Sequence, residues 1–212
     1  MTVVVLHDLG DPAGGARWRA AAPDWIVPEL PGHGATPPVR TGHYDPMSPI
    51  AIARWSIADP DDATVVGVRR NAHGALVHAA GGGCARVVIV DGLWGRWRSP
   101  SEQVDAFYGF VRAIAGDPAA TGPAPSAGTD PRATYGYGLF TSARFSQRFW
   151  AAIGQPVLVV ETPRSTTPPG ERAERMSWFG GPTELVELDT DDPAAIVTAI
   201  DRWLRPDDEV RR

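Results

Sequence analysis

The chain has 212 residues, a formal net charge of −5 and a single cysteine, Cys84. The acidic balance argues against a broad nucleic-acid-binding surface, which would be basic, and one cysteine excludes both a disulfide framework and a cysteine-rich zinc site. All twenty basic residues are arginine, so chemistry that needs a lysine Schiff base is excluded as well.

The first predicted strand, over residues 3–6, is a short β-branched run that stops at His7 and Asp8. It is too short for the core of a signal peptide, and no stretch approaches the ~18 apolar residues of a membrane span. We therefore expect a cytoplasmic protein with no membrane span and no nucleic-acid partner.

Similar apolar runs predict further strands over residues 24–27, 63–68, 86–90, 156–160 and 184–188. An alanine-rich stretch, residues 72–80, predicts a helix that ends at three glycines. The last helix begins with Asp192 as its N-cap and Pro193 as its first helical residue. Apolar strands that alternate with helices predict an α/β fold, with a mainly parallel sheet flanked by helices on both faces.

An insert of about sixty residues separates the strands predicted at 86–90 and 156–160. Residues 94–150 hold eleven of the eighteen aromatic residues, among them Trp94, Trp97, Phe107 and Tyr108. These side chains either pack the insert onto the sheet or line the inner face of a lid over an apolar pocket. We divide the chain into a core, residues 1–93 and 151–212, and a short helical lid insert, residues 94–150.

The order of the motifs is typical of one superfamily. The first strand is followed by His7, Asp8 and Leu9, residues 29–34 read Glu-Leu-Pro-Gly-His-Gly, and the helix at Asp192 closes the chain. In these features the sequence resembles the α/β-hydrolase superfamily over nearly its whole length. The resemblance implies an α/β-hydrolase-like fold, an oxyanion loop at His7, Asp8 and Leu9, and a ligand bound between this loop and the aromatic residues of the lid.

The resemblance also implies a nucleophilic serine on a strained turn between a strand and a helix, in the pattern G-x-S-x-G. Aligning the Gly-Ala-Leu run at residues 74–76 with the family places Asn71 at the nucleophile position. No serine occurs between Ser56 and Ser99. Because an asparagine amide does not replace an activated hydroxyl, the sequence predicts that no covalent acyl-enzyme forms.

The histidine that completes the family's catalytic triad follows the last strand in chain order. In this sequence no histidine follows His78, and only Glu161 stands where the family's acid is expected. The resemblance is therefore to a catalytically degenerate member of the superfamily.

Three side chains remain candidates for acid–base chemistry: His73 beside the turn, Asp91 after the strand at 86–90, and Glu161. Each has a structural alternative, such as a histidine bonded to the backbone or an aspartate that caps a loop. His7 and His33 match family positions that brace neighbouring loops. No cofactor is implied, and the histidine spacing does not suit a metal site.

Three functions follow as hypotheses. The first is a degenerate hydrolase-fold protein that binds an apolar or acyl-type small molecule beneath the lid. The second is a non-hydrolytic enzyme, for example a lyase, cyclase, decarboxylase or isomerase, that uses His73, Asp91 or Glu161 in the same pocket. The third is a protein-interaction partner that binds through the lid aromatics.

Overall fold

A parallel β-sheet is the central element of the computed structural model, which describes residues 1–9, 11, 13–40, 44–45, 47–93, 130, 133 and 147–205. Within these residues the sheet has five strands in the order β1-β2-β3-β4-β5, and every neighbouring pair is parallel. The strands are β1 (Thr2–Leu6), β2 (Ala63–Val68), β3 (Arg86–Val90), β4 (Val157–Glu161) and β5 (Thr183–Glu187). Because all strands run in the same direction, their carboxyl ends lie at one edge of the sheet.

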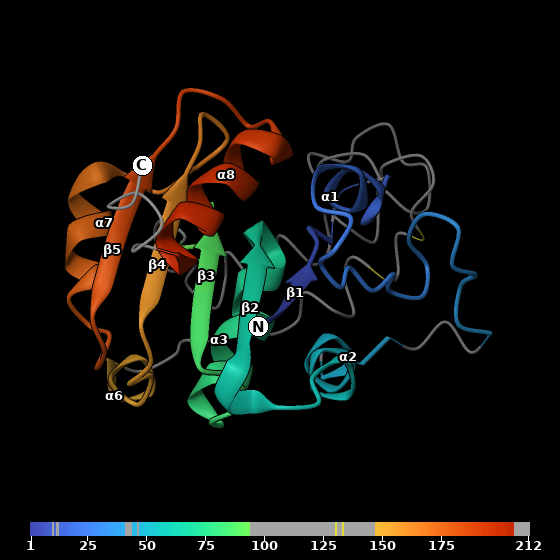
Figure 1. The fold of residues 1–212 in the computed structure, drawn as a ribbon, viewed down its shortest axis with the longest axis horizontal. Coiled ribbons are helices and arrows are strands. Elements are labelled where there is room, and N and C mark those ends of the chain that lie inside the picture. The colour runs from blue at the N-terminus through green and yellow to red at the C-terminus, as the bar shows by residue number, and fades with distance from the viewer. Residues whose placement is uncertain are drawn as a thin grey trace, which may run out of the picture.

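Helices cover both faces of the sheet (Figure 1). Helices α1 (Ala16–Ala21) and α8 (Pro193–Leu204) pack on one face. The other face is covered by α2 (Ser48–Ser56), α3 (Ala72–Ala80), α6 (Gln147–Ala151) and α7 (Pro169–Met176). Two 3-10 turns, η1 (Pro60–Asp62) and η2 (Arg69–Asn71), flank β2. This arrangement confirms the predicted α/β fold.

Successive side chains of a strand point to opposite faces of the sheet. Strands β1 to β4 are buried on both faces, whereas β5, at the edge of the sheet, is partly exposed. In β2, Val65 belongs to the core beneath α3, whereas Val66 belongs to the core beneath α1 and α8. The predicted last helix is confirmed: Asp192 Oδ1 accepts a hydrogen bond from the Ala194 backbone N–H at 3.2 Å, and Pro193 is the first helical residue.

Some boundaries differ from the prediction. Residues 24–27 form only a single bridge, between Ile26 and Val4, because prolines on both sides of this run limit pairing. Strand β4 begins at Val157 rather than at Pro156, which has no N–H to donate to the sheet. The sequence analysis missed α1, α2 and α7, which have no side-chain hydrogen bond at their N-caps.

The predicted lid lies almost wholly outside the described residues, and so do Trp94, Trp97, Phe107 and Tyr108. At its C-terminal end, Trp150 of α6 is buried in the core beneath α3. Its ring meets Trp178 and Phe179 edge to face, with centroids 6.1 and 4.9 Å apart. This part of the insert therefore packs onto the sheet. None of the helices in the described ranges is long and apolar enough to span a membrane.

Candidate functional site

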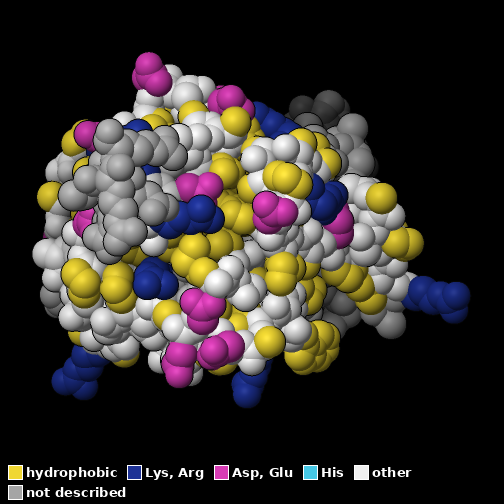
Figure 2. Space-filling model, viewed as in Figure 1, with side chains coloured by type: hydrophobic (Ala, Val, Ile, Leu, Met, Phe, Trp, Pro, Cys, Tyr) yellow, Lys and Arg dark blue, Asp and Glu magenta, His cyan; other side chains and the backbone are white. Residues whose placement is uncertain are grey.

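A small cavity lies at the carboxyl edge of the sheet, beside the ends of β2 and β3 and between α1 and the start of α8. Its volume is about 90 Å³. We call it the strand-end cavity. Its lining combines four apolar side chains and one proline with seven charged residues, which are Asp8, Asp11, Arg17, Arg69, Asp91, Arg164 and Asp191. Figure 2, which shows the face that carries α8, has acidic and basic side chains lying next to one another.

The turn that leaves β2 has a strained backbone. Arg69, the first residue after the strand, has φ = +49°, a value that residues with a side chain rarely adopt. Two residues earlier, an added Cβ on Gly67 would lie 2.5 Å from Ala72 Cα, so β2 and α3 approach too closely for any side chain there. A strained residue between a strand and a helix, two positions after a glycine, is the geometry of a nucleophile elbow.

The structure thus places the left-handed turn residue at Arg69, two positions before the residue that the sequence alignment chose. Asn71 has φ = −83° and precedes α3 in a helical conformation. Its buried Nδ2 donates a hydrogen bond to the His7 carbonyl oxygen at 2.6 Å, which ties the loop after β1 to the start of α3. The Gly-Ala-Leu run used for the alignment lies inside α3. The glycine that stands two residues before the nucleophile in the family's pattern corresponds instead to Gly67 in β2.

Two arginine–aspartate pairs border the strand-end cavity. Arg69 Nε lies 3.4 Å from Asp8 Oδ2, which joins the loops after β1 and β2. Arg164 Nη1 lies 3.4 Å from Asp191 Oδ2, which joins the loops after β4 and β5. The Arg164 side chain is 50% exposed and that of Arg69 30%, so both guanidinium groups are reached by solvent.

Asp91 fastens the ends of β3 and β4 together. Its Oδ1 accepts a hydrogen bond from the Thr162 backbone N–H, and its Oδ2 accepts one from the Thr162 hydroxyl, both at 2.7 Å. Asp91 also has a positive φ of +52°, and its own N–H donates to the Val160 carbonyl oxygen. Although Asp91 lines the cavity, both carboxylate oxygens are engaged by Thr162.

Glu161, the last residue of β4, is buried and is not among the residues that line the strand-end cavity. Burial raises the pKa of its carboxyl, and the guanidinium of Arg172, 3.7 Å away, acts in the opposite direction. Arg172 also pairs with Glu187. Glu161 therefore lies in a charged contact with α7 and β5, apart from Arg69.

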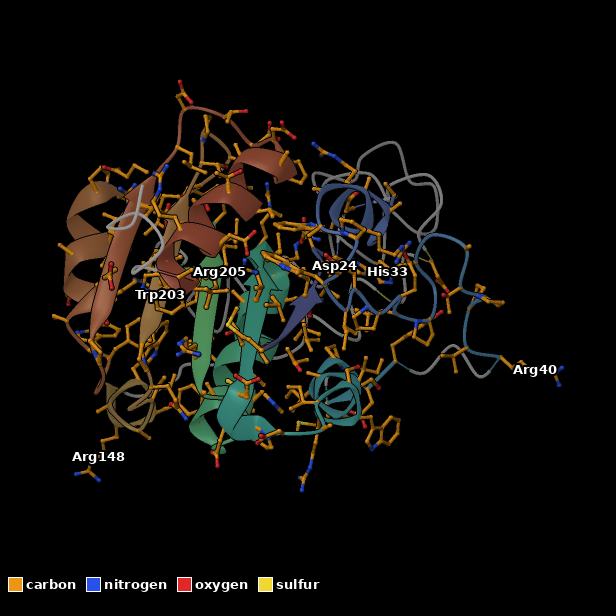
Figure 3. The ribbon with its side chains drawn as sticks, viewed as in Figure 1. Asp24, His33, Arg40, Arg148, Trp203 and Arg205 are labelled. Atoms are coloured by element: carbon orange, nitrogen blue, oxygen red, sulfur yellow. The ribbon has the colours of Figure 1, made fainter. Side chains whose placement is uncertain are left out.

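The described histidines are buried, and no histidine is visible on the face shown in Figure 2. His7 and His33 meet edge to face with ring centroids 5.4 Å apart, and His33 Nε2 lies 2.9 Å from the Leu9 carbonyl oxygen. Figure 3 shows His33 among the loops beside α1. Of the three residues predicted for the oxyanion loop, only Asp8 lines the cavity, since His7 and Leu9 are fully buried.

His73, the predicted general base, is buried in α3 and does not line the strand-end cavity. Burial lowers its pKa from 6.5 to about 4. The unfolded chain therefore takes up a proton below pH 6.5 that folded His73 does not, so stability falls as the pH falls. We expect this group to make folding about 2 kcal/mol less favourable at pH 5 than at pH 8.

Urea unfolding of the wild type and His73→Gln at both pH values checks this expectation. The difference in unfolding free energy between the two proteins should change by about 2 kcal/mol, with the variant less sensitive to acid. Parallel pH dependences would show that His73 titrates normally in the folded protein.

Neither a protein-family model nor a curated protein sequence matches this chain. Solved structures are nevertheless similar over almost its full length. A thermophilic esterase from Thermogutta terrifontis superposes with a TM-score of 0.72 and 16% identity, covering 97% of this chain and 90% of that one. MenH from S. aureus gives a TM-score of 0.68 and 14% identity, over 97% of this chain and 94% of that one.

An α/β-hydrolase from Sphaerobacter thermophilus DSM 20745 gives a TM-score of 0.67 and 18% identity, over 96% of this chain and 92% of that one. The chain has the α/β-hydrolase fold. The predicted resemblance is confirmed at the level of the fold, which hosts many functions, so the function has to be argued from the site itself.

Several residues at the site of this α/β-hydrolase fold were missed by the sequence analysis, namely Asp11, Arg17, Arg69, Arg164 and Asp191. A signal was present for Arg69, because a glycine stands two residues before it at the end of a predicted strand. Arg164 and Asp191 follow β4 and β5, but nothing local indicates that they meet.

Proposed function

We propose that this protein binds a small molecule in the strand-end cavity and does not cleave it through a serine nucleophile. The observation that carries the proposal is Arg69, whose strained backbone occupies the turn where hydrolases of this fold present their serine. A guanidinium stays protonated and has only N–H donors, so it binds anions and does not attack a carbonyl carbon.

The remaining positions around the turn support the same conclusion. The loop after β5 carries Asp189, Thr190 and Asp191, and no histidine follows His78 in the sequence. A base that activates a hydroxyl has to lie within hydrogen-bond reach of it. The charged groups that line the described part of the strand-end cavity are aspartates and arginines, and four of them form the pairs Arg69–Asp8 and Arg164–Asp191.

The non-hydrolytic enzyme hypothesis has less support, because its three acid–base candidates do not share the strand-end cavity. His73 and Glu161 are buried and do not line the cavity, and both oxygens of Asp91 accept hydrogen bonds from Thr162. The partner hypothesis depends on the lid aromatics, which apart from Phe149 and Trp150 lie outside the described residues. It stays a prediction, as does the apolar or acyl-type part of the ligand, which those aromatics would contact.

Activity-based labelling tests the proposal. We expect a fluorophosphonate probe to leave the folded protein unlabelled and p-nitrophenyl esters to turn over at the background rate. An unrelated serine esterase serves as the positive control for both assays. Stoichiometric labelling of any residue near Arg69, or efficient ester turnover, would contradict the proposal.

Restoring a serine should not restore hydrolysis. We expect both Arg69→Ser, which puts a hydroxyl on the strained turn, and Asn71→Ser to remain at background turnover. A serine hydroxyl is a poor nucleophile until a positioned base takes its proton, and none of the described histidines lines the strand-end cavity to act as that base. Asn71→Ser also removes the hydrogen bond to His7, so its folding is checked by circular dichroism. Robust turnover by Arg69→Ser alone would reveal a functional base beside the turn.

A further inference from the structure

We infer that the strand-end cavity recognises a carboxylate group of its ligand, held by the guanidinium groups of Arg69 and Arg164. The inference rests on the proposed function and adds the chemical class of the ligand. Two arginines from loops that follow different strands line one cavity, Arg69 after β2 and Arg164 after β4. A guanidinium offers its N–H groups in a planar fork that matches the two oxygens of a carboxylate.

Both guanidinium groups keep donors for a ligand. Each contacts its aspartate through one nitrogen at 3.4 Å, which is longer than the ~2.7–2.9 Å of a strong charge-assisted hydrogen bond. Within the described part of the chain, neither guanidinium makes another hydrogen bond or ion pair. With respect to the described residues, most of the N–H donors of Arg69 and Arg164 are therefore available to a ligand.

The aspartates of the cavity differ in how many hydrogen bonds they accept, and among the described residues the buried Asp8 Oδ1 has no hydrogen-bond partner. Asp91 accepts two hydrogen bonds from Thr162, and Asp11 Oδ1 accepts one from the Ala13 backbone N–H at 2.9 Å. Asp8 and Asp191 are the partners of the two arginines. The described lining holds four aspartates and three arginines, so the cavity has no net positive charge and recognition depends on the geometry of the guanidinium groups. This balance disfavours a dianion such as phosphate more than a singly charged carboxylate.

The size of the cavity restricts what enters it. Pockets for drug-sized ligands have volumes of roughly 300–1,000 Å³, whereas the strand-end cavity measures about 90 Å³. The described part of the site therefore takes a small carboxylic acid, or the carboxylate end of a longer molecule. This is consistent with an acyl-type ligand whose chain leaves the cavity.

Titrations of isotope-labelled protein by NMR test the inference with matched probes. We expect butyrate to bind saturably and at least ~10-fold more tightly than butyramide, its neutral counterpart, or inorganic phosphate. Arg69→Gln and Arg164→Gln should each weaken butyrate binding ~10-fold or more, because glutamine keeps polarity but loses the charge and the fork. Arg148→Gln is the control: this side chain projects outward from α6, at the end of the sheet where the strands begin (Figure 3), and its removal should leave binding unchanged.

The outcomes separate the inference from the proposed function. Equal binding of butyrate and butyramide, unaffected by either arginine variant, would overturn carboxylate recognition and leave non-hydrolytic binding intact. A folded wild type that binds no butyrate would overturn it as well, as would an Arg148→Gln effect equal to that of Arg69→Gln. Failure of the proposed function would show instead as fluorophosphonate labelling. If Arg69→Gln does not fold, Arg164→Gln, on an exposed loop, gives the decisive result.

Discussion

Replacing Gly67 with alanine is expected to lower the free energy of unfolding by about 3 kcal/mol. The new Cβ would lie 2.5 Å from Ala72 Cα and 2.8 Å from the Asn71 carbonyl oxygen, both of which are backbone atoms. It would also lie 2.7 Å from the Ala75 side chain. Because none of these three contacts is the end of a flexible side chain, α3 has to move away from β2, and the strained turn at Arg69 has to move with it.

Gly154→Ala provides the matched control, since an added Cβ there has no neighbour within 4 Å and the backbone has no positive φ. We expect it to change stability by no more than ~0.5 kcal/mol. Urea denaturation of both variants, with the midpoint and slope fitted separately, measures the difference. A Gly67→Ala protein as stable as Gly154→Ala would show that β2 and α3 are not as tightly packed as the structure has them.

Replacing Asp91 with alanine is expected to lower the free energy of unfolding by about 3 kcal/mol, because two buried donors of Thr162 lose their acceptors. Thr162 is only 6% exposed, so water does not readily replace the lost carboxylate. Alanine at this position also has to adopt the positive φ of +52°, which side-chain-bearing residues other than asparagine and aspartate strongly disfavour.

Asp91→Asn separates the hydrogen bonds from the charge. Asparagine tolerates the left-handed backbone and retains one acceptor oxygen for the Thr162 N–H, while its amide can donate to the Thr162 hydroxyl. We expect it to lose only ~1 kcal/mol. Thermal and urea unfolding of both variants measure the two losses. Equal losses would mean that the negative charge, rather than the pair of hydrogen bonds, holds the ends of β3 and β4 together.

Several strands and helices of the core could be predicted because each is indicated by a short run of consecutive residues. The β-branched runs of β2 and β3 and the alanine-rich α3 have the predicted boundaries, since each depends on a few consecutive side chains and on the residue that ends them. The parallel arrangement followed from strands that are apolar on both faces. The resemblance to α/β-hydrolases, carried by motifs along the chain, predicted the fold that the structure shows.

The site depended on contacts between distant residues, which no local pattern encodes. Arg69 has a positive φ because close packing of Gly67 against α3 sets the turn, and arginine has no intrinsic preference for that conformation. Asp91 meets Thr162 across 71 residues, and Arg164 meets Asp191 across 27. Besides a strand at residues 24–27 that forms only one bridge, local patterns in the sequence predicted the five strands of the sheet and their shared carboxyl edge. Only the tertiary structure decided which charged side chains face one another there, because that depends on how the loops between the strands pack.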